Sequence, residues 1–323
     1  MSDAHPPKLS LVVPVFNEAG SLPDLHRQIA SALEGMDYEV LYVDDGSSDT
    51  SLSILTDIQK TCPRVRLISF RRNFGQTAAL SAGFRYARGS IIVPLDADGQ
   101  NDPADIPQLV KKLEDGFDIV SGWRKERKDN PVTRTLPSRM ANWLIGKITG
   151  VQLHDYGCTL KAYRAESVKH IRLYGEMHRF IPALARWGGG KVTEMVVNHR
   201  PRTTGKTKYG LNRTFKVILD LMTIKFLASF STKPIYIFGG LGVFCFFGSF
   251  ISGLTVLLMK LIQGYSMNRN PLLIISMMLM MAAIQFVLMG LLAEILVRTY
   301  HESQDRPIYV IDKILEPSET QTS

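Results

Sequence analysis

Two long stretches without a charged residue limit how this chain can fold more than any other feature. Residues Ile235 to Met259 form 25 consecutive uncharged positions, and Leu272 to Ala293 form another 22. About 20 apolar residues are enough for a helix to cross the hydrocarbon core of a bilayer. Because a buried helix of a soluble protein rarely needs so long an uncharged run, the sequence predicts two transmembrane helices near the C-terminus.

The charges that flank these stretches predict where the rest of the chain lies. Only Lys260 and Arg269 stand between the two apolar stretches. The outer flanks carry Arg213, Lys216, Lys225, Lys233, Arg298 and Arg306. Cytoplasmic segments are enriched in Lys and Arg, so a multi-pass protein of the inner (plasma) membrane is expected, with both termini and the large N-terminal part in the cytoplasm. The N-terminus has no apolar signal segment, which agrees with this orientation.

The composition excludes several classes of protein. The 323 residues include 38 Lys and Arg against 30 Asp and Glu, a formal net charge of +8. Aromatic residues do not alternate with the basic ones, so an anionic lipid surface is a better partner for this charge than nucleic acid. The three cysteines Cys62, Cys158 and Cys245 are far apart and form no CxxC pair. A disulfide framework or a zinc site is therefore not expected.

Four apolar runs of strand length alternate with helical patterns in the N-terminal part. They are Leu9 to Phe16, Tyr38 to Val43, Val65 to Phe70 and Ile91 to Leu95. This alternation predicts an α/β fold with a mostly parallel sheet and helices on both faces. Ligands of such sheets bind at the carboxyl ends of the strands. All four runs end in polar residues: Asn17 and Glu18, Asp44 and Asp45, Arg71 to Asn73, and Asp96 with Asp98.

The fourth run ends in two acids separated by one residue. Side chains alternate along an extended strand, so Asp96 and Asp98 are expected on one side while Ala97 points away. Two carboxylates this close repel each other unless a positive group lies beside them. Mg²⁺ is held by one or two carboxylates together with substrate phosphates, and Mn²⁺ also accepts oxygen ligands. A divalent metal site is expected here, and a solvated turn is the alternative.

Basic segments occupy much of the chain between the fourth strand and the apolar stretches. Residues 124–139 are basic and contain prolines, which predicts a loop or lid. A strand over Val192 to Asn198 leads into His199-Arg200-Pro201-Arg202 and the basic segment Thr203 to Tyr209. Residues 211–230 have the apolar and basic spacing of a helix in a membrane interface. The predicted units are a cytosolic domain (1–210), interface helices (211–233), a two-helix transmembrane anchor (234–298) and a cytosolic tail (299–323).

An α/β domain joined to a membrane anchor suits an enzyme that transfers a group from a water-soluble donor to a lipid. Asp44 or Asp45 can accept hydrogen bonds from a nucleotide base or ribose, and Asp98 can bind a metal that bridges a diphosphate. No GxGxxG follows the first strand, and no GxxxxGK[ST] occurs. A dinucleotide-dependent oxidoreductase and a P-loop nucleotidase are therefore not expected.

Three motifs resemble glycosyltransferase family 2 and its GT-A-type fold. They are Leu11 to Glu18 (LVVPVFNE), Val43 to Asp49 (VDDGSSD) and Asp96 to Gln100 (DADGQ). The two apolar stretches, the segment His199 to Tyr209 and the closing run Glu294 to Tyr309 narrow the resemblance. Together they are similar to the polyisoprenyl-phosphate glycosyltransferases: bactoprenol glucosyltransferases and, more distantly, dolichol-phosphate mannose synthases. The resemblance covers nearly the whole chain.

The resemblance implies a role for each matching residue. The nucleotide-sugar pocket would be lined by Pro14, Asn17, Glu18, Asp44, Asp45, Asp96 and Gln100. Asp98 would be the principal metal ligand and a catalytic residue, with Asp96 near the ribose or the metal. The acceptor phosphate or the diphosphate would be bound by Arg124, Arg200, Arg202, Lys206 and Lys208. Asp155 matches the acid often assigned as the catalytic base.

The implied reaction is an inverting transfer of a sugar to a polyisoprenyl phosphate, with Mg²⁺ or Mn²⁺ as cofactor. UDP-glucose and undecaprenyl phosphate are the expected substrates, while UDP-GlcNAc, UDP-galactose, a 4-amino-4-deoxyarabinose donor and GDP-mannose remain open. An acceptor phosphate is already anionic at neutral pH, because its second pKa is about 6. A strong base is thus less necessary than for a hydroxyl acceptor. Asp155 is either a base or a positioning group, and pairing with Lys161 or Arg164 is its structural alternative.

Two competing hypotheses are a processive polysaccharide synthase and a catalytically silent membrane scaffold. The synthases carry a Gln-x-x-Arg-Trp motif, but Ala183 stands at the glutamine position before Arg186-Trp187. Two membrane helices are also few for a translocation channel. The acids and the arginines expected of an active enzyme are all present, which argues against a scaffold. Self-association is expected, since some relatives form tetramers.

Overall fold

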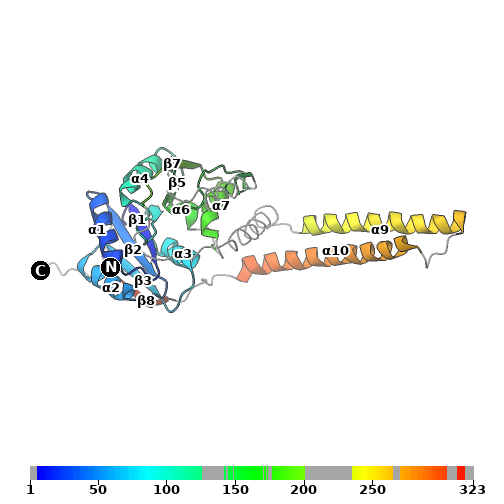
Figure 1. Cartoon of the computed structure of the whole chain (residues 1–323), viewed down its shortest axis with the longest axis horizontal. Coiled ribbons are helices and arrows are strands. Elements are labelled where there is room, and N and C mark those ends of the chain that lie inside the picture. Colours follow the sequence, from blue (N-terminus) through cyan, green and yellow to red (C-terminus); the bar gives the residue numbers. More distant parts are fainter. Residues whose placement is uncertain are drawn as a thin grey trace. The chain divides into compact units, whose positions relative to one another are not determined.

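The chain divides into two compact units (Figure 1). The computed structural model describes residues 6–125, 149–169, 177–200, 235–264, 270–303 and 311–316, with a few positions between 142 and 173. The first unit contains Met1–Met222 and Pro307–Ser323, and the second contains Thr223–Arg306. The first is an α/β domain and the second is a pair of helices.

In the part of the first unit that the structure describes, an eight-stranded sheet forms the centre, in the order β7-β5-β6-β4-β1-β2-β3-β8. Its strands are β1 (Leu9–Val15), β2 (Tyr38–Asp44), β3 (Val65–Phe70), β4 (Ile91–Pro94), β5 (Ile119–Trp123), β6 (Lys161–Arg164), β7 (Val192–Val196) and β8 (Ile311–Leu315). β1 pairs in parallel with β2 and β4, β2 with β3, and β5 with β7. β6 and β8 run antiparallel to their neighbours. The predicted α/β fold with a mostly parallel sheet is confirmed.

The position of β1 determines where a ligand can bind. The chain places β2 on one side of β1 and β4 on the other, so the order of the strands reverses between β1 and β4. In open α/β sheets the crevice outside such a switch point is the usual ligand site. The loops after Val15, Asp44 and Pro94 therefore meet at one edge of the sheet.

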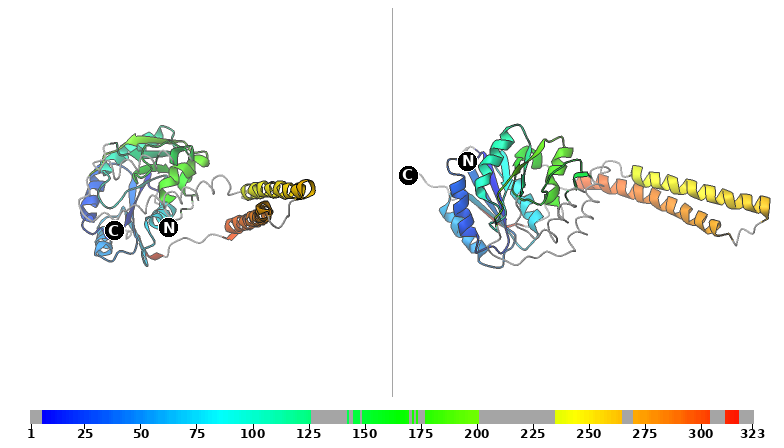
Figure 2. Two further views of the ribbon diagram at one scale, coloured as in Figure 1. Left: turned by 45° about the vertical axis from the view of Figure 1, so that its right-hand side comes forward. Right: turned by 45° about the horizontal axis from the view of Figure 1, so that its top comes forward.

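Helices cover both faces of the sheet (Figure 2). They are α1 (Leu22–Ala32), α2 (Ser51–Thr61), α3 (Gln76–Tyr86), α4 (Ile106–Glu114), α6 (Ala165–Val168) and α7 (Ile181–Trp187), with short 3₁₀ turns η1 (Pro103–Asp105) and η3 (Met177–Phe180). α1, α2 and α4 share one apolar core with the side chains of Leu9, Leu11 and Val13. α3 packs on β1 from the opposite face, where Gly83 lies so close to Val12 that an added Cβ would clash.

The strand β8 corrects the expectation of a separate C-terminal tail. Ile311–Leu315 follows the second apolar helix in the sequence and adds an antiparallel strand to β3. Its sequence IDKIL does not alternate apolar and polar residues, so the segment is not recognised as a strand from sequence. Because β3 would otherwise be an edge with unpaired backbone groups, β8 closes that edge. The α/β domain is thus built from both ends of the chain.

A buried ion network fastens this C-terminal strand to the domain. The guanidinium of Arg66 on β3 donates to Glu39 at 3.0 Å and to both oxygens of Glu316, at 2.9 Å for the shortest bond. The side chains of Arg66 and Glu39 are only 6% and 7% exposed, whereas that of Glu316 is 43% exposed. Ser10 and the backbone N–H of Arg88 complete the hydrogen bonds of Glu39. The Arg66–Glu39 pair is therefore buried, whereas Glu316 binds Arg66 from the surface.

The second unit consists of α9 (Ile235–Gln263) and α10 (Pro271–Ser303), which run antiparallel side by side (Figure 2). Both helices are long and apolar enough to cross a bilayer. Apolar side chains such as Phe244 and Ile262 are each 76% exposed, unlike those of a soluble core helix. The Ser249 and Ser276 hydroxyls each donate to the other residue's carbonyl oxygen, at 2.7 and 2.9 Å. Hydrogen bonds between small polar residues are common in helix pairs of membranes, so the two helices could span one, and the predicted anchor over 234–298 stays a prediction.

The network around Arg66 yields a stability prediction. Arg66→Met leaves the buried Glu39 carboxylate without its cation, and breaking a buried pair in this way costs about 3–5 kcal/mol. Glu316→Gln removes a half-exposed partner and should cost about 1 kcal/mol or less. We expect the thermal unfolding midpoint of the detergent-solubilised chain to fall far more for Arg66→Met. Arg27→Met, which removes an exposed arginine paired with Asp24, is the control. Equal shifts in all three variants would contradict this account.

Candidate functional site

The loops after β1 and β2 are joined by Asn17. Its side-chain oxygen accepts hydrogen bonds from the backbone N–H groups of Ser48 at 2.8 Å and Asp49 at 3.3 Å. Its own N–H donates to the Ser47 hydroxyl at 3.1 Å. Asn17 has a φ of 56°, a left-handed conformation that is uncommon outside glycine. The loop is therefore held in a fixed shape at the edge of the sheet, where the sequence predicts nucleotide binding.

The two acids after β2 are buried and have different partners. Asp44 accepts from the N–H of Ser47 at 3.3 Å and from the Ser69 hydroxyl at 3.3 Å. Asp45 accepts from the backbone N–H groups of Phe74 at 2.7 Å and Gly75 at 2.8 Å. Burial raises the pKa of both acids, and these hydrogen bonds oppose that rise. Asp45 thus holds the loop that opens α3, a task that the sequence analysis did not assign to it.

The predicted carboxylate pair lies at the end of β4. Asp96 accepts a hydrogen bond from the Gln76 amide at 2.8 Å and another from Thr159. Burial, followed by the charge of Asp98, raises the pKa of Asp96 to about 6, while Thr159, Arg124 and Lys161 oppose the rise. The N–H of Gln100 donates to Asp98 at 3.1 Å. Two carboxylates whose charges act on each other, one of them partly buried, are a donor set that fits a divalent cation.

The donor set also limits what kind of metal site this is. Among the described residues, no group of three or more His, Cys, Asp or Glu side chains is arranged to hold a metal. Asp96 and Asp98 alone would leave most positions around an octahedral ion open. Such a site fits a cation that binds together with a phosphate-bearing ligand and does not fit a closed structural metal site.

Asp155 forms a bidentate ion pair with Arg124. The guanidinium Nε lies 2.7 Å from one carboxylate oxygen, and the second terminal nitrogen lies 3.1 Å from the other. The two side chains are 4% and 15% exposed. The acid therefore pairs with the arginine after β5, and its charge also acts on the buried Lys161. The pair fixes the Arg124 guanidinium at the same edge of the sheet as Asp96, whose charge also acts on Arg124.

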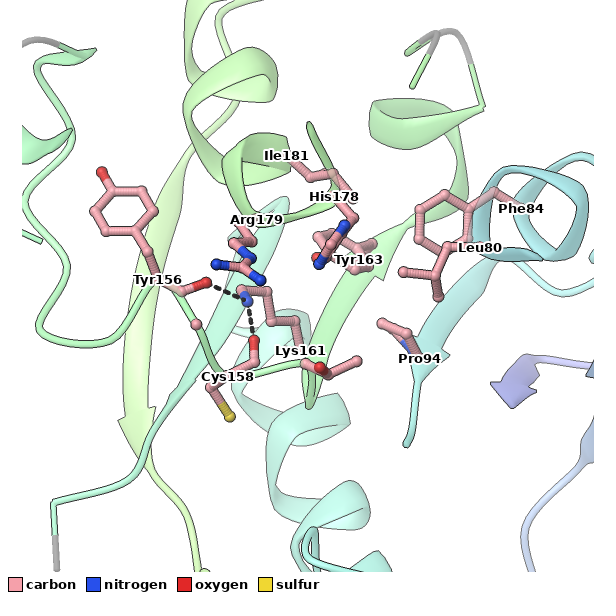
Figure 3. Close-up of a pocket in the computed structure, with 12 residues that line it drawn as sticks. Leu80, Phe84, Pro94, Tyr156, Cys158, Lys161, Tyr163, His178, Arg179 and Ile181 are labelled. Carbon is pink, nitrogen blue, oxygen red and sulfur yellow. Dashed lines mark hydrogen bonds between the residues drawn. The ribbon is translucent and has the colours of Figure 1, made fainter. Parts of the chain in front are cut away.

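Lys161 is buried beside this ion pair and lines a small cavity (Figure 3). Its ammonium group donates to the carbonyl oxygens of Tyr156, at 3.3 Å, and Cys158. Burial lowers the pKa of Lys161. The Arg179 guanidinium points toward it, and His178 shares a hydrogen bond of 2.8 Å with Thr77. Lys161 thus fixes the turn that follows Asp155 through two backbone carbonyl groups.

The segment after β7 is tied to the loop that follows the carboxylate pair. Arg200 donates from its backbone N–H to the carbonyl oxygen of Gln100 at 2.9 Å. Its guanidinium lies 2.6 Å from an Asp102 oxygen and 2.6 Å from the Gln28 side-chain oxygen. His199 forms an isolated β-bridge with Asn101. The structure therefore brings the start of the predicted phosphate-binding segment next to the Asp96–Asp98 loop, with Arg200 already paired.

The remaining predicted residues fall into two groups. Pro14 lies on β1 opposite Val43, and the Glu18 N–H donates to Ser51 at 3.0 Å, so both are at the same edge of the sheet. Arg202, Lys206 and Lys208 lie outside the described residues, as do the predicted interface helices over 211–233. Their proposed roles remain predictions.

Two residues that hold Asp96 were not found in the sequence analysis. Gln76 stands at the first turn of α3, and Thr159 stands just before β6. Both are distant from Asp96 in the sequence and belong to ordinary polar residue types. Gly75, with a φ of 95°, is the one local signal of a special turn before Gln76.

Comparison with known proteins identifies the class to which this geometry belongs. Residues 10–172 match the family described as glycosyl transferase family 2. The chain is also 42% identical to the dodecaprenyl-phosphate galacturonate synthase of Rhizobium johnstonii over 96% of its own length and 93% of that protein. The chain therefore belongs to glycosyltransferase family 2 and is a glycosyltransferase. The resemblance to the polyisoprenyl-phosphate glycosyltransferases is confirmed by this relative.

Solved structures confirm the fold. Glucosyl-3-phosphoglycerate synthase from Mycobacterium tuberculosis, in complex with Mn²⁺, UDP and phosphoglyceric acid, has a TM-score of 0.53 and 18% sequence identity. The match covers 68% of this chain and 78% of that one. The complex of the same enzyme with Mn²⁺, UDP-glucose and phosphoglyceric acid has a TM-score of 0.54, 17% identity and coverage of 68% and 80%. The domain thus has the predicted GT-A-type fold.

Two glycines in this edge allow a direct test of its packing. Gly46 has a φ of 66°, and a Cβ there would lie 2.4 Å from the carbonyl carbon of Arg72. Gly99 has a similar φ of 72° but has no atom within 4 Å of that position. Gly99→Ala should cost about 1–2 kcal/mol, the strain of a left-handed residue. Gly46→Ala adds a backbone clash, so we expect a clearly lower thermal unfolding midpoint. Equal midpoints would show that the two loops do not approach as described.

Proposed function

We propose that this protein transfers a sugar from a nucleotide sugar to the phosphate of a polyisoprenyl phosphate at the cytoplasmic face of a membrane. The observation that carries the proposal is the placement of the Asp96–Asp98 carboxylates beside the Arg124–Asp155 pair, at one edge of a GT-A-type sheet. The Asp96–Asp98 carboxylates suit a cation with a diphosphate, and the Arg124 guanidinium suits an anionic acceptor. The two apolar helices would keep the domain at the membrane where such an acceptor resides.

The donor side of the site supports binding of a nucleotide diphosphate. The rigid loops around Asn17 and Asp44 present backbone and carboxylate groups that suit a base and a ribose. Asp98 and Asp96 would hold Mg²⁺ or Mn²⁺ together with the diphosphate oxygens. The bound cation would supply positive charge to the leaving diphosphate. The structural relatives in complex with Mn²⁺ and UDP support this assignment by analogy only.

The acceptor side is assigned to Arg124, together with the basic segment that begins at Arg200. Arginine forks match phosphate geometry, and Asp155 holds the Arg124 guanidinium in one orientation. An ionised acceptor phosphate needs no strong base, because it carries its charge before the reaction. We therefore favour Asp155 as the group that positions Arg124. In the transfer, a phosphate oxygen forms a bond to the sugar C1 with inversion while the bond from C1 to the diphosphate oxygen breaks, and the nucleoside diphosphate departs.

The identity of the sugar is the finer part of the proposal. The sequence alone favours UDP-glucose, whereas the relative with 42% identity bears the name of a galacturonate synthase. Because that relative matches almost the whole chain, we propose a uridine diphosphate hexuronate as the first donor to test and UDP-glucose as the second. A dodecaprenyl or undecaprenyl phosphate is the corresponding acceptor. The location in the inner membrane, with the domain in the cytoplasm, and a homo-oligomeric state remain part of the proposal.

The first test measures transfer and its dependence on Asp98. The purified full chain is mixed with an undecaprenyl phosphate, Mn²⁺ and each donor in turn, and the lipid product is identified by mass. We expect Asp98→Asn to lower kcat about a hundredfold or more, because the charge of the leaving group is then poorly compensated. Electron paramagnetic resonance should show weaker Mn²⁺ binding in the presence of UDP. Asp57→Asn, at an exposed ion pair on α2, is the control. Undiminished transfer by Asp98→Asn would refute the assigned site.

A second test separates the two roles of Asp155. If Asp155 positions Arg124, Asp155→Asn should raise the KM for the acceptor and leave most of kcat, because the charge of the phosphate is unaffected. If Asp155 is a general base, the same variant should lose about 10²–10⁴-fold in kcat with little change in KM. The matched variant Arg124→Lys should raise the acceptor KM in the same way. A large loss confined to kcat would contradict the positioning role.

A further inference from the structure

The loop of residues 155–160, which we call the bridging loop, contacts both halves of the proposed site. At its start, the Asp155 carboxylate binds the Arg124 guanidinium at 2.7 and 3.1 Å. Near its end, the Thr159 side chain donates a hydrogen bond to Asp96. The bridging loop therefore connects the arginine assigned to the acceptor with an acid assigned to the metal and the donor.

Lys161, the first residue of β6, holds the middle of the bridging loop (Figure 3). Its ammonium group donates to the carbonyl oxygens of Tyr156, at 3.3 Å, and Cys158. Lys161 is 2% exposed, so its charge depends on these carbonyl groups and on nearby acids for the stabilisation that water would otherwise give. Burial lowers the pKa of Lys161, and the charges of Asp155 and Asp96 oppose that fall. One buried cation thus binds the loop at two points.

The first carbonyl group links Lys161 to the acceptor half of the site. The carbonyl oxygen of Tyr156 and the N–H of Gly157 belong to one planar peptide unit, so their directions change together. This N–H donates to Asp155 at 3.1 Å. It reaches the same carboxylate oxygen that binds a terminal nitrogen of Arg124. Because Lys161 holds the carbonyl end of this unit, it also holds the N–H that orients the Asp155 carboxylate.

The second carbonyl group links Lys161 to the donor half. The carbonyl group of Cys158 shares a planar peptide unit with the backbone nitrogen of Thr159. Rotation of this unit would displace the Thr159 side chain, which binds Asp96. Cys158 is 1% exposed, so its carbonyl group would lose a hydrogen bond in a place that water hardly reaches. The ammonium group therefore keeps this unit in one orientation.

The ends of the bridging loop are held independently of Lys161. Just before the loop, the backbone N–H of His154 donates to Glu194 on β7 at 2.9 Å. At its end, the N–H of Gly122 on β5 donates to the carbonyl oxygen of Leu160 at 3.0 Å. A Cβ at Gly122 would lie 2.6 Å from that oxygen, so β5 approaches the loop closely. Loss of the ammonium group should therefore preserve the fold and loosen the two inner peptide units.

We propose that Lys161 is a positioning residue that orients the acceptor half and the donor half of the site together. It acts on Arg124 through Asp155. It acts on Asp96 through Thr159. This inference rests on the proposed transfer to a polyisoprenyl phosphate, because that proposal assigns the arginine to the acceptor and the acid to the metal. The ammonium group itself contacts neither substrate in this account, since it is buried and bound to the loop.

The test compares Lys161→Gln with Lys161→Arg in the detergent-solubilised full chain. Binding of Mn²⁺ in the presence of UDP is measured by electron paramagnetic resonance, and binding of undecaprenyl phosphate by native mass spectrometry. We expect Lys161→Gln to weaken both about tenfold, because hydrogen bonds from a charged donor are lost. Lys161→Arg keeps the charge and the donors, and the small cavity beside Lys161 gives room for them, so it should retain most of both affinities. Lys169→Gln, at an exposed lysine after α6, is the matched control.

Two further variants separate the halves of the site. Thr159→Val should weaken Mn²⁺ binding alone, and Asp155→Asn should weaken lipid binding alone. The double variant Lys161→Gln with Thr159→Val should bind Mn²⁺ no more weakly than Lys161→Gln, because both changes act through the same contact to Asp96. If Lys161→Gln does not fold, Lys161→Met takes its place with the same expectations, since its neutral side chain of similar length needs no partner.

A direct effect of the lysine charge predicts the opposite sign. Loss of a positive charge near the metal site would then strengthen Mn²⁺ binding in Lys161→Gln. That result overturns the inference, as would a lower thermal unfolding midpoint with both affinities unchanged, or a loss in only one of them. Because binding is measured apart from turnover, the two proposals fail differently. A wild-type chain that transfers no sugar but shows the expected binding pattern would refute the proposed reaction and leave the role of Lys161 supported.

Discussion

The cost of removing carboxylates from water governs how the functional edge of this sheet is built. Among the described residues there, Asp44, Asp45, Asp105 and Asp155 are buried, and Asp96 is partly exposed. Different partners stabilise these acids. Asp45 accepts hydrogen bonds from two backbone N–H groups, Asp105 accepts them from an asparagine, and Asp155 forms an ion pair with an arginine. Asp96 is the least compensated, since its neighbour Asp98 adds a second negative charge, and its pKa rises to about 6. The least compensated negative charge therefore lies at Asp96 and Asp98, where a cation could bind.

Pairing of buried charges also stabilises the edge of the sheet that β3 and β8 form. Arg66 is buried on β3 and is held between Glu39 on β2 and Glu316 after β8. Because Glu316 follows the two apolar helices in the sequence, the domain is completed only after the chain has passed through the second unit. Both connections between the units therefore start from segments of the α/β domain, one after β7 and one before β8.

Sequence reasoning succeeded where a physical signal is local. Continuous apolar runs identified β1 to β4 within about one residue, and acids at their ends located the edge that carries the site. It failed where a contact joins distant residues without a pattern. Nothing near Asp155 indicates Arg124 as its partner, and nothing near Arg200 indicates Asp102. β8 was missed because five residues with a central Asp and Lys resemble a solvated tail until a neighbouring strand is known.

These long-range pairs change how the motif residues are to be understood. A match to a family motif gives the type of residue at a position, and the structure shows which hydrogen bonds and ion pairs that residue makes. Arg124 and Arg200 are both basic residues of the kind that bind phosphate, yet they differ in their surroundings. Arg124 uses its Nε and one terminal nitrogen to bind a single acid, whereas Arg200 uses one donor on each terminal nitrogen to bind two different side chains. Residue type therefore nominates candidates for ligand binding, and the contacts that each arginine already makes distinguish their surroundings.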